Sequence, residues 1–231
     1  MDNTEIKDVT EFLLGLKQDN HRKSCLSMAI TSARHLTGRD IKTGEGNINE
    51  MITTLTLRDD VREENLINES FFTGVTTYLI ILEQIGILFK SNLKILKENN
   101  NTPGLIVALN HFSSFSADEI DTIYALRNSL THNFGLNNIP KRGSKSKKCY
   151  KFTLMFDSSE KVIKAAPLEW DGNYNDKTDQ SRTKIFIPKL CDSFEEVIKT
   201  LNSKFEEDHL ILRIEDKEEI YSRFSIVITN N

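Results

Sequence analysis

The chain of 231 residues has few cysteines: only Cys25, Cys149 and Cys191. They are odd in number, lie far apart and form no C-x-x-C pair, which argues against a disulfide framework and against a zinc site. Such a content is typical of proteins whose thiols stay reduced, as in the cytoplasm. No cluster of carboxylates suggests a metal site either, so we expect neither a metal nor another cofactor.

An excess of positive charge is also missing. Lys and Arg number 30 against 34 Asp and Glu, giving a formal net charge of −4. The chain as a whole is therefore not a polyanion binder, and any contact with nucleic acid must come from a local patch. Charged residues make up 28% and hydrophobic residues 38% of the chain, a balance that indicates a soluble globular protein and not a disordered one.

Segments that direct a chain to membranes are scarce. The opening stretch MDNTEIKDVTEF carries acids and no apolar core, so no signal peptide is expected. One run, 71–89, has the length of a membrane span, but Glu83 and Gln84 lie inside it. A carboxylate near a bilayer centre costs roughly 2.5–3.5 kcal/mol on insertion scales. We therefore expect a buried core helix, no membrane contact and a cytoplasmic location.

The first 140 residues have the apolar spacing of α-helices. In IKDVTEFLLGLKQ apolar residues recur every three or four positions, and the same spacing appears over 21–36 and from about Ile48 into the 60s. The long apolar helix is predicted over 71–97, and ENNNTPG breaks it. Ser116-Ala-Asp-Glu119 then has the form of a capping box for a helix that ends near Phe134.

Composition changes at residue 141, where KRGSKSKK holds five basic residues in eight. Beyond it the period shifts towards two, which predicts a hairpin of 149–157 with 161–167 and further strands at 183–188 and 224–229. The segment LILRIED is open between strand and helix.

Asp192-Ser193 is predicted to cap a helix over 194–205. The sequence as a whole thus predicts a mainly α protein. Residues 1–140 would form a helical bundle, and 141–231 a basic linker with a smaller, strand-rich α+β extension.

The segment ALRNSLTHNF places Arg127, Asn128 and His132 within six residues of one another on a helix. Positions four apart share a helix face, whereas positions five apart point about 140° away from each other. Two such helices packed about a two-fold axis would bring two arginines and two histidines to one seam. An imidazole can exchange protons with a ribose 2′-hydroxyl or a leaving 5′-oxygen, and a guanidinium can clamp a phosphate.

RNSLTH resembles the R-N-x-x-x-H motif of the HEPN superfamily. The resemblance implies a helical bundle that dimerises through the motif helix. It further implies a metal-independent endoribonuclease, of the kind found in toxin–antitoxin and antiviral systems, whose composite site leaves a 2′,3′-cyclic phosphate. Arg127 would then clamp the phosphate, His132 would be the acid and base, and Asn128 the polar residue that accompanies the arginine. An RNA substrate, a homodimer and an antitoxin or regulatory protein would be the partners.

Other interpretations of the motif remain open. The superfamily also contains members that only bind or dimerise, so the alternative is a non-catalytic HEPN-like module for protein, nucleotide or RNA binding. Arg127 and His132 near a helix C-terminus are also favoured by the helix dipole alone. Glu83, in its apolar helix, either pairs with one of these two residues and orients the site or simply reaches the surface.

Two further segments have an open role. The basic segment would give sequence-independent, salt-sensitive affinity for RNA, or it is a solvated linker. Its cations are Lys141, Arg142, Lys145, Lys147 and Lys148. The Asp-Gly pair at 171–172, flanked by Trp170 and Tyr174, marks either a binding loop or, more simply, a turn.

Overall fold

The computed structural model describes residues 1–17, 21–46, 61–94, 99, 101–140, 148–157 and 159–227, with the side chains of 61–69 and 133 left out. Over these described residues the protein is a mixed α/β fold with several sheets, 53% helical and 15% in strands. The predicted mainly α helical bundle with a strand-rich extension is therefore wrong. Strands are not confined to the C-terminal part, because two of them lie in the first 91 residues and pair with strands from the end of the chain.

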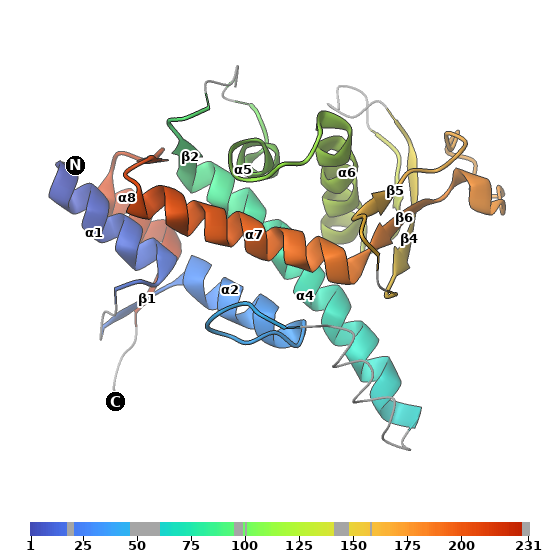
Figure 1. Cartoon of the computed structure of the whole chain (residues 1–231), viewed down its shortest axis with the longest axis horizontal. Coiled ribbons are helices and arrows are strands. Elements are labelled where there is room, and N and C mark those ends of the chain that lie inside the picture. Colours follow the sequence, from blue (N-terminus) through green and yellow to red (C-terminus); the bar gives the residue numbers. More distant parts are fainter. Residues whose placement is uncertain are drawn as a thin grey trace.

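Helices and strands are interspersed along the described parts of the chain (Figure 1). The α-helices are α1 (Asn3–Leu14), α2 (Cys25–Leu36), α4 (Val61–Leu88), α5 (Gly104–Phe112), α6 (Ala117–Asn133), α7 (Ile187–Glu206) and α8 (Lys217–Phe224). The strands are β1 (Arg22–Ser24), β2 (Phe89–Ser91), β3 (Asn137–Asn138), β4 (Tyr150–Met155), β5 (Ile163–Lys164), β6 (Thr183–Phe186), β7 (Leu210–Leu212) and β8 (Ser225–Val227). A 3-10 turn, η1 (Asp179–Ser181), precedes β6.

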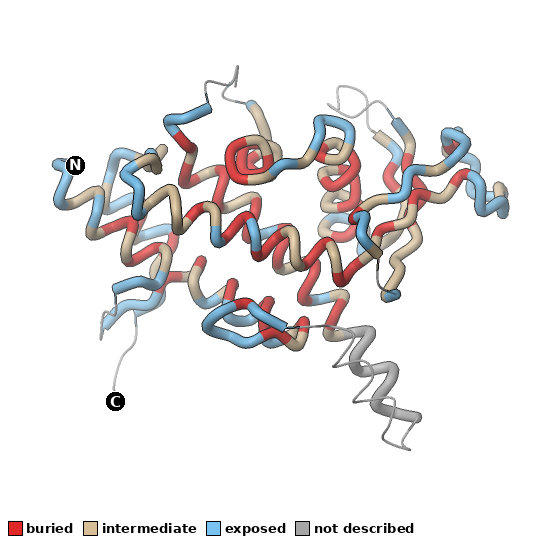
Figure 2. The backbone as a smooth tube through the Cα atoms, in the orientation of Figure 1, coloured by how far each residue is buried: buried red, intermediate tan, exposed pale blue. Residues whose placement is uncertain are grey.

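The C-terminal third is part of the same hydrophobic core as the N-terminal helices. Helix α7 crosses in front of α4 in Figure 1, and both helices are lined with buried residues in Figure 2. Antiparallel pairing of β1 with β8 and of β2 with β7 ties the two ends of the chain together. One cluster of buried side chains runs from α1 to α8, so it spans the composition change at residue 141.

The largest sheet has the order β3-β4-β6-β5. Strands β4 and β6 are parallel, with Leu154 opposite Ile185, while β5 is antiparallel to β6. The predicted hairpin of 149–157 with 161–167 is wrong, because β6 lies between these two strands. Strand β6 suits the position between β4 and β5, because alternate residues of this strand are buried and the Ile185 side chain is completely buried.

The apolar helix α4 ends at Leu88, nine residues before the predicted end at 97. The chain then enters β2, whose partner β7 comes from the far end of the sequence. Within α4, Ser70–Leu88 is long and apolar enough to cross a membrane, and 56% of its apolar window is buried inside the protein. That burial agrees with the predicted core helix of a soluble protein. The helix expected from Ile48 to the 60s lies mostly outside the described residues.

Helix α7 begins earlier than predicted. It starts at Ile187, with Pro188 in its first turn, directly after β6. Proline suits the first helical turn because its missing N–H would have no partner there. Asp192 and Ser193 are therefore not a cap: the Ser193 hydroxyl donates to the carbonyl of Lys189 within the helix, and the Asp192 carboxylate pairs with Arg39 at 2.5 Å.

A close contact between α4 and α5 positions the candidate site. A Cβ added to Gly86 would overlap the carbonyl of Gly104, and one added to Gly104 would overlap the carbonyl of Glu83. The two backbones can therefore touch only because both positions are glycine. Helix α5 was missing from the sequence analysis because it is buried on almost every side, which leaves no one-sided apolar pattern to detect.

Candidate functional site

The motif helix α6 begins as its sequence predicts. The Ser116 hydroxyl accepts from the Glu119 amide, and the Glu119 carboxylate accepts from the Ser116 amide at 2.8 Å. This confirms the predicted capping box. The helix ends at Phe134, which adopts a left-handed conformation (φ 46°) and is 79% exposed. A bulky apolar residue rarely adopts the left-handed conformation, and it is rarely so exposed.

The three motif side chains lie together within one copy of the chain. Arg127 Nη1 is 2.9 Å from His132 Nε2, and it donates to Asn128 Oδ1 at 3.1 Å. The five-residue spacing between arginine and histidine places them on different helix faces, so the long arginine side chain bridges the difference. An arginine has only donors, so Nε2 of His132 is the atom that can accept in this contact.

Glu83 joins this group from α4. Its carboxylate lies 3.8 Å from Arg127 Nη2 and accepts from the backbone amides of Gly104 and Leu105 at 2.9 and 3.2 Å. Helix α5 follows Pro103 and has no side-chain cap of its own, so Glu83 supplies the cap from the neighbouring helix. Of the two open interpretations, the structure favours the one in which Glu83 faces the motif.

The Arg127 guanidinium keeps unused hydrogen-bonding capacity. Its Nε has no hydrogen-bond partner among the described residues, and the 3.8 Å separation from Glu83 is longer than a hydrogen bond. Arg127 is 19% exposed at its side chain, and His132 is exposed. The Nε atom itself is buried, so a phosphate oxygen from solvent would accept from the exposed part of the terminal guanidinium N–H groups.

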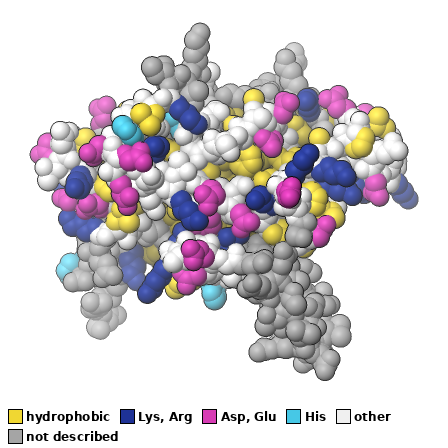
Figure 3. Space-filling model, in the orientation of Figure 1, with side chains coloured by type: hydrophobic (Ala, Val, Ile, Leu, Met, Phe, Trp, Pro, Cys, Tyr) yellow, Lys and Arg dark blue, Asp and Glu magenta, His cyan; other side chains and the backbone are white. Residues whose placement is uncertain are grey.

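The basic segment is mostly outside the described residues. Lys141, Arg142, Lys145 and Lys147 all lie there; Lys148 is described and lines a pocket between α6 and the sheet. On the face in Figure 3, the Lys and Arg side chains drawn in colour are interspersed with Asp and Glu. Attraction for a polyanion would therefore be local, as the net charge predicts.

Two parts of this site were not found from the sequence: the α5 amides of Gly104 and Leu105, and the exposed Phe134. Pro103-Gly104 gives no signal for the first, because this dipeptide is typical of a turn. Within the described ranges, no group of three or more His, Cys, Asp or Glu side chains could hold a metal ion.

Comparison with protein-family models, curated proteins and solved structures finds no match for this chain. The functional assignment therefore depends on the geometry of Arg127, Asn128, His132 and Glu83.

Proposed function

We propose that the protein is a metal-independent endoribonuclease that uses HEPN-type chemistry at a site shared by two copies of the chain. The observation that carries this proposal is the 2.9 Å contact between Arg127 Nη1 and His132 Nε2. It places an imidazole beside a partly exposed guanidinium near the C-terminal end of a helix. This is the pair of groups that phosphodiester cleavage by an internal nucleophile requires.

The reaction follows from the roles of these two groups. The His132 imidazole takes the proton of a ribose 2′-hydroxyl as the 2′-oxygen bonds to the adjacent phosphorus. The bond from phosphorus to the 5′-oxygen breaks, and that oxygen receives a proton from the histidine of the second copy, which enters the reaction protonated and leaves it neutral. Arg127 binds the phosphate oxygens and stabilises the added charge of the transition state. The products are a 2′,3′-cyclic phosphate and a 5′-hydroxyl end.

The surface next to the motif supports a homodimer. Phe134 follows the motif directly and is 79% exposed, and Ile80, one turn before Glu83 on α4, is 45% exposed. Exposed apolar side chains beside a polar site are typical of a protein interface. A cytoplasmic location and a role as a toxin or defence effector, held in check by a neutralising protein, belong to the same proposal.

The test is cleavage of single-stranded RNA by the purified chain in the presence of a metal chelator. His132→Ala should lower the cleavage rate about 100-fold or more, because general acid–base catalysis contributes at least that much. The 2′,3′-cyclic phosphate can be detected directly on the cleaved ends.

His35→Ala is the matched control, since His35 is an exposed histidine in the last turn of α2. It should cleave RNA at the unaltered rate. Cleavage that stops on adding chelator, or that survives His132→Ala, would reject the mechanism. If the protein binds RNA or a partner but cuts none, the non-catalytic binding module is the better description.

A further inference from the structure

A second polar pocket lies at the other end of the motif helix. It has a volume of about 160 Å³ and is formed by the first turns of α6, the start of β4, the loop before η1 and the start of β6. That is room for about five waters, at about 30 Å³ each. The pocket therefore has room for one flat ring of nucleobase size, and the rest of a nucleotide would lie outside it.

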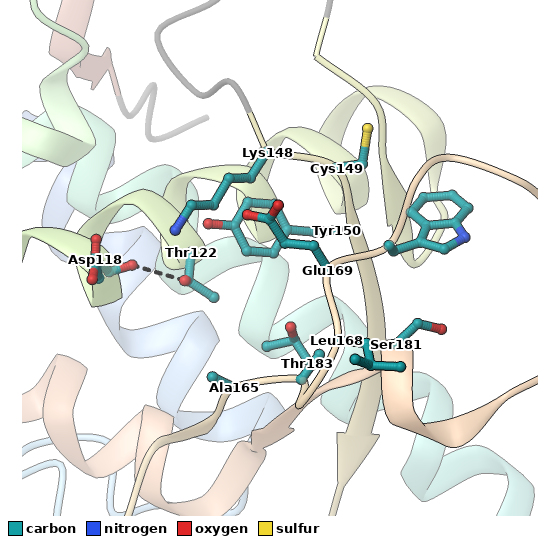
Figure 4. A pocket seen from close by; sticks show the side chains of 12 residues that line it. Asp118, Thr122, Lys148, Cys149, Tyr150, Ala165, Leu168, Glu169, Ser181 and Thr183 are labelled. Carbon is teal, nitrogen blue, oxygen red and sulfur yellow. Dashed lines mark hydrogen bonds between the residues drawn. The ribbon is translucent and has the colours of Figure 1, made fainter.

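The floor of the pocket offers a hydroxyl group. Thr183 lines the pocket and is 6% exposed, and in Figure 4 its hydroxyl points into the pocket. A bound ligand could therefore donate to this hydroxyl or accept from it.

The Tyr150 ring forms a second wall. Its hydroxyl donates to Asp121 at 3.0 Å, and burial raises its pKa to about 12. The ring is therefore neutral and fixed in orientation. Together with Leu168 and Ala165 it gives the pocket apolar surfaces against which a flat ring can pack.

The charged groups at the rim have both signs. In Figure 4 the Glu169 carboxylate overlies the Tyr150 ring, the Lys148 ammonium lies on the side of Thr122, and Asp118 lies beyond Thr122. Two carboxylates disfavour a phosphate in this pocket, and a lysine disfavours a metal ion. A neutral ring that carries both donors and an acceptor matches this set.

We propose that this pocket binds a guanine base of the RNA substrate, and this inference rests on the proposed ribonuclease function. The Watson–Crick edge of guanine has two adjacent donors, N1–H and the N2 amino group, beside the O6 acceptor. A carboxylate such as Glu169 accepts both donors, and Lys148 donates to O6. Adenine, cytosine and uracil each lack the adjacent pair of donors, so the pocket discriminates against them.

The pocket lies at a fixed distance from His132 along helix α6. Thr122 and Asp118 precede His132 by 10 and 14 residues on α6, about 15 to 21 Å along the helix at 1.5 Å per residue. This separation is a few nucleotides of extended single strand. Cleavage is therefore expected at a constant short offset from a guanine.

The protein carries its own reporter for this test. Its single tryptophan, Trp170, lines the pocket and is 3% exposed. Titrating the full-length chain with GMP should change the Trp170 fluorescence, with binding at least about tenfold tighter than for AMP, CMP or UMP. Glu169→Gln should abolish that preference, because an amide accepts with only one atom. Glu169 is exposed, so the variant should fold normally.

Glu160→Gln is the matched control, the same exchange at an exposed position outside the pocket. It should bind GMP like the original chain. Equal binding of all four mononucleotides, or no binding, overturns the inference.

Mapping the cut sites separates the two proposals. Cuts at a fixed offset from guanine, lost in Glu169→Gln, support both. RNA cleavage without base preference overturns the guanine pocket but leaves the ribonuclease standing. GMP binding with no RNA cleavage overturns the ribonuclease and makes a free guanine nucleotide the ligand.

Discussion

Two arginine–glutamate pairs in this protein are built from the same groups and are suited to opposite tasks. Arg34 and Glu195 form a buried bidentate pair at 3.0 and 2.8 Å, with side chains 10% and 2% exposed. The Tyr78 hydroxyl donates to the same carboxylate at 2.5 Å. Burial, followed by this carboxylate, raises the tyrosine pKa, so the hydroxyl stays a donor. Arg127 and Glu83 are half-buried and 3.8 Å apart.

The two pairs differ in how many N–H groups of the arginine lack a hydrogen-bond acceptor. Arg34 also donates to the carbonyls of Ile41 and Lys42, so the buried pair is closed and joins α2, its following loop and α7. Arg127 keeps an Nε without a described partner. That Nε is buried, so it is the partial exposure of the Arg127 guanidinium that would let it meet a ligand, whereas the saturated interior pair stabilises the fold.

Disrupting the buried Arg34–Glu195 pair should have the largest effect on stability. Glu195→Ala leaves the Arg34 charge buried without its partner, which should lower the free energy of unfolding by about 3–5 kcal/mol. Urea unfolding followed by circular dichroism measures this change. Glu196→Ala is the control, because the Glu196 side chain is 68% exposed and forms a surface pair with Lys199 on the same helix; it should cost less than about 1 kcal/mol. Similar losses in both variants would show that the buried pair has no special role.

Disrupting the partly exposed Arg127–Glu83 pair should have a smaller effect on stability. Glu83→Ala removes the acceptor for the Gly104 and Leu105 amides and should cost about 0.5–2 kcal/mol, as for other lost helix caps. Glu83→Gln keeps one acceptor, so it should recover part of the stability while still leaving Arg127 without its counter-charge. If Glu83 positions Arg127, the cleavage rate falls in both variants. A loss as large as that of Glu195→Ala would contradict the distinction between the two pairs.

The smallest effect is expected at the end of α6 and has the opposite sign. Phe134→Gly relieves the left-handed conformation and should stabilise the monomer by about 1 kcal/mol. It also removes the exposed ring, so the dimer should weaken. Phe134→Ala removes the ring without relieving the backbone and should weaken the dimer alone. Sedimentation and urea unfolding separate the two effects; unaltered association in both variants would show that no second copy covers Phe134.

The sequence predicted those elements whose stabilising contacts are local. Patterns among residues close together in the sequence predict the capping box at Ser116 and Glu119, the core helix around Glu83 and the strands β4 and β6. The mainly α architecture failed because β1 and β2 pair with strands of the last 22 residues of the chain. No local pattern marks such pairs. The predicted cap at Asp192 failed because that carboxylate pairs with Arg39, which is 153 residues away.

By itself, the sequence determined that Arg127, Asn128 and His132 share the end of one capped helix, because helix geometry fixes neighbours three to five residues apart. Only the tertiary structure decided that Glu83 faces Arg127, since this requires two glycines to let α4 touch α5. It also decided that Lys148, Glu169 and Thr183 border one pocket. Contacts of this kind form when packing closes long loops between distant segments, and they leave no periodic trace in the chain.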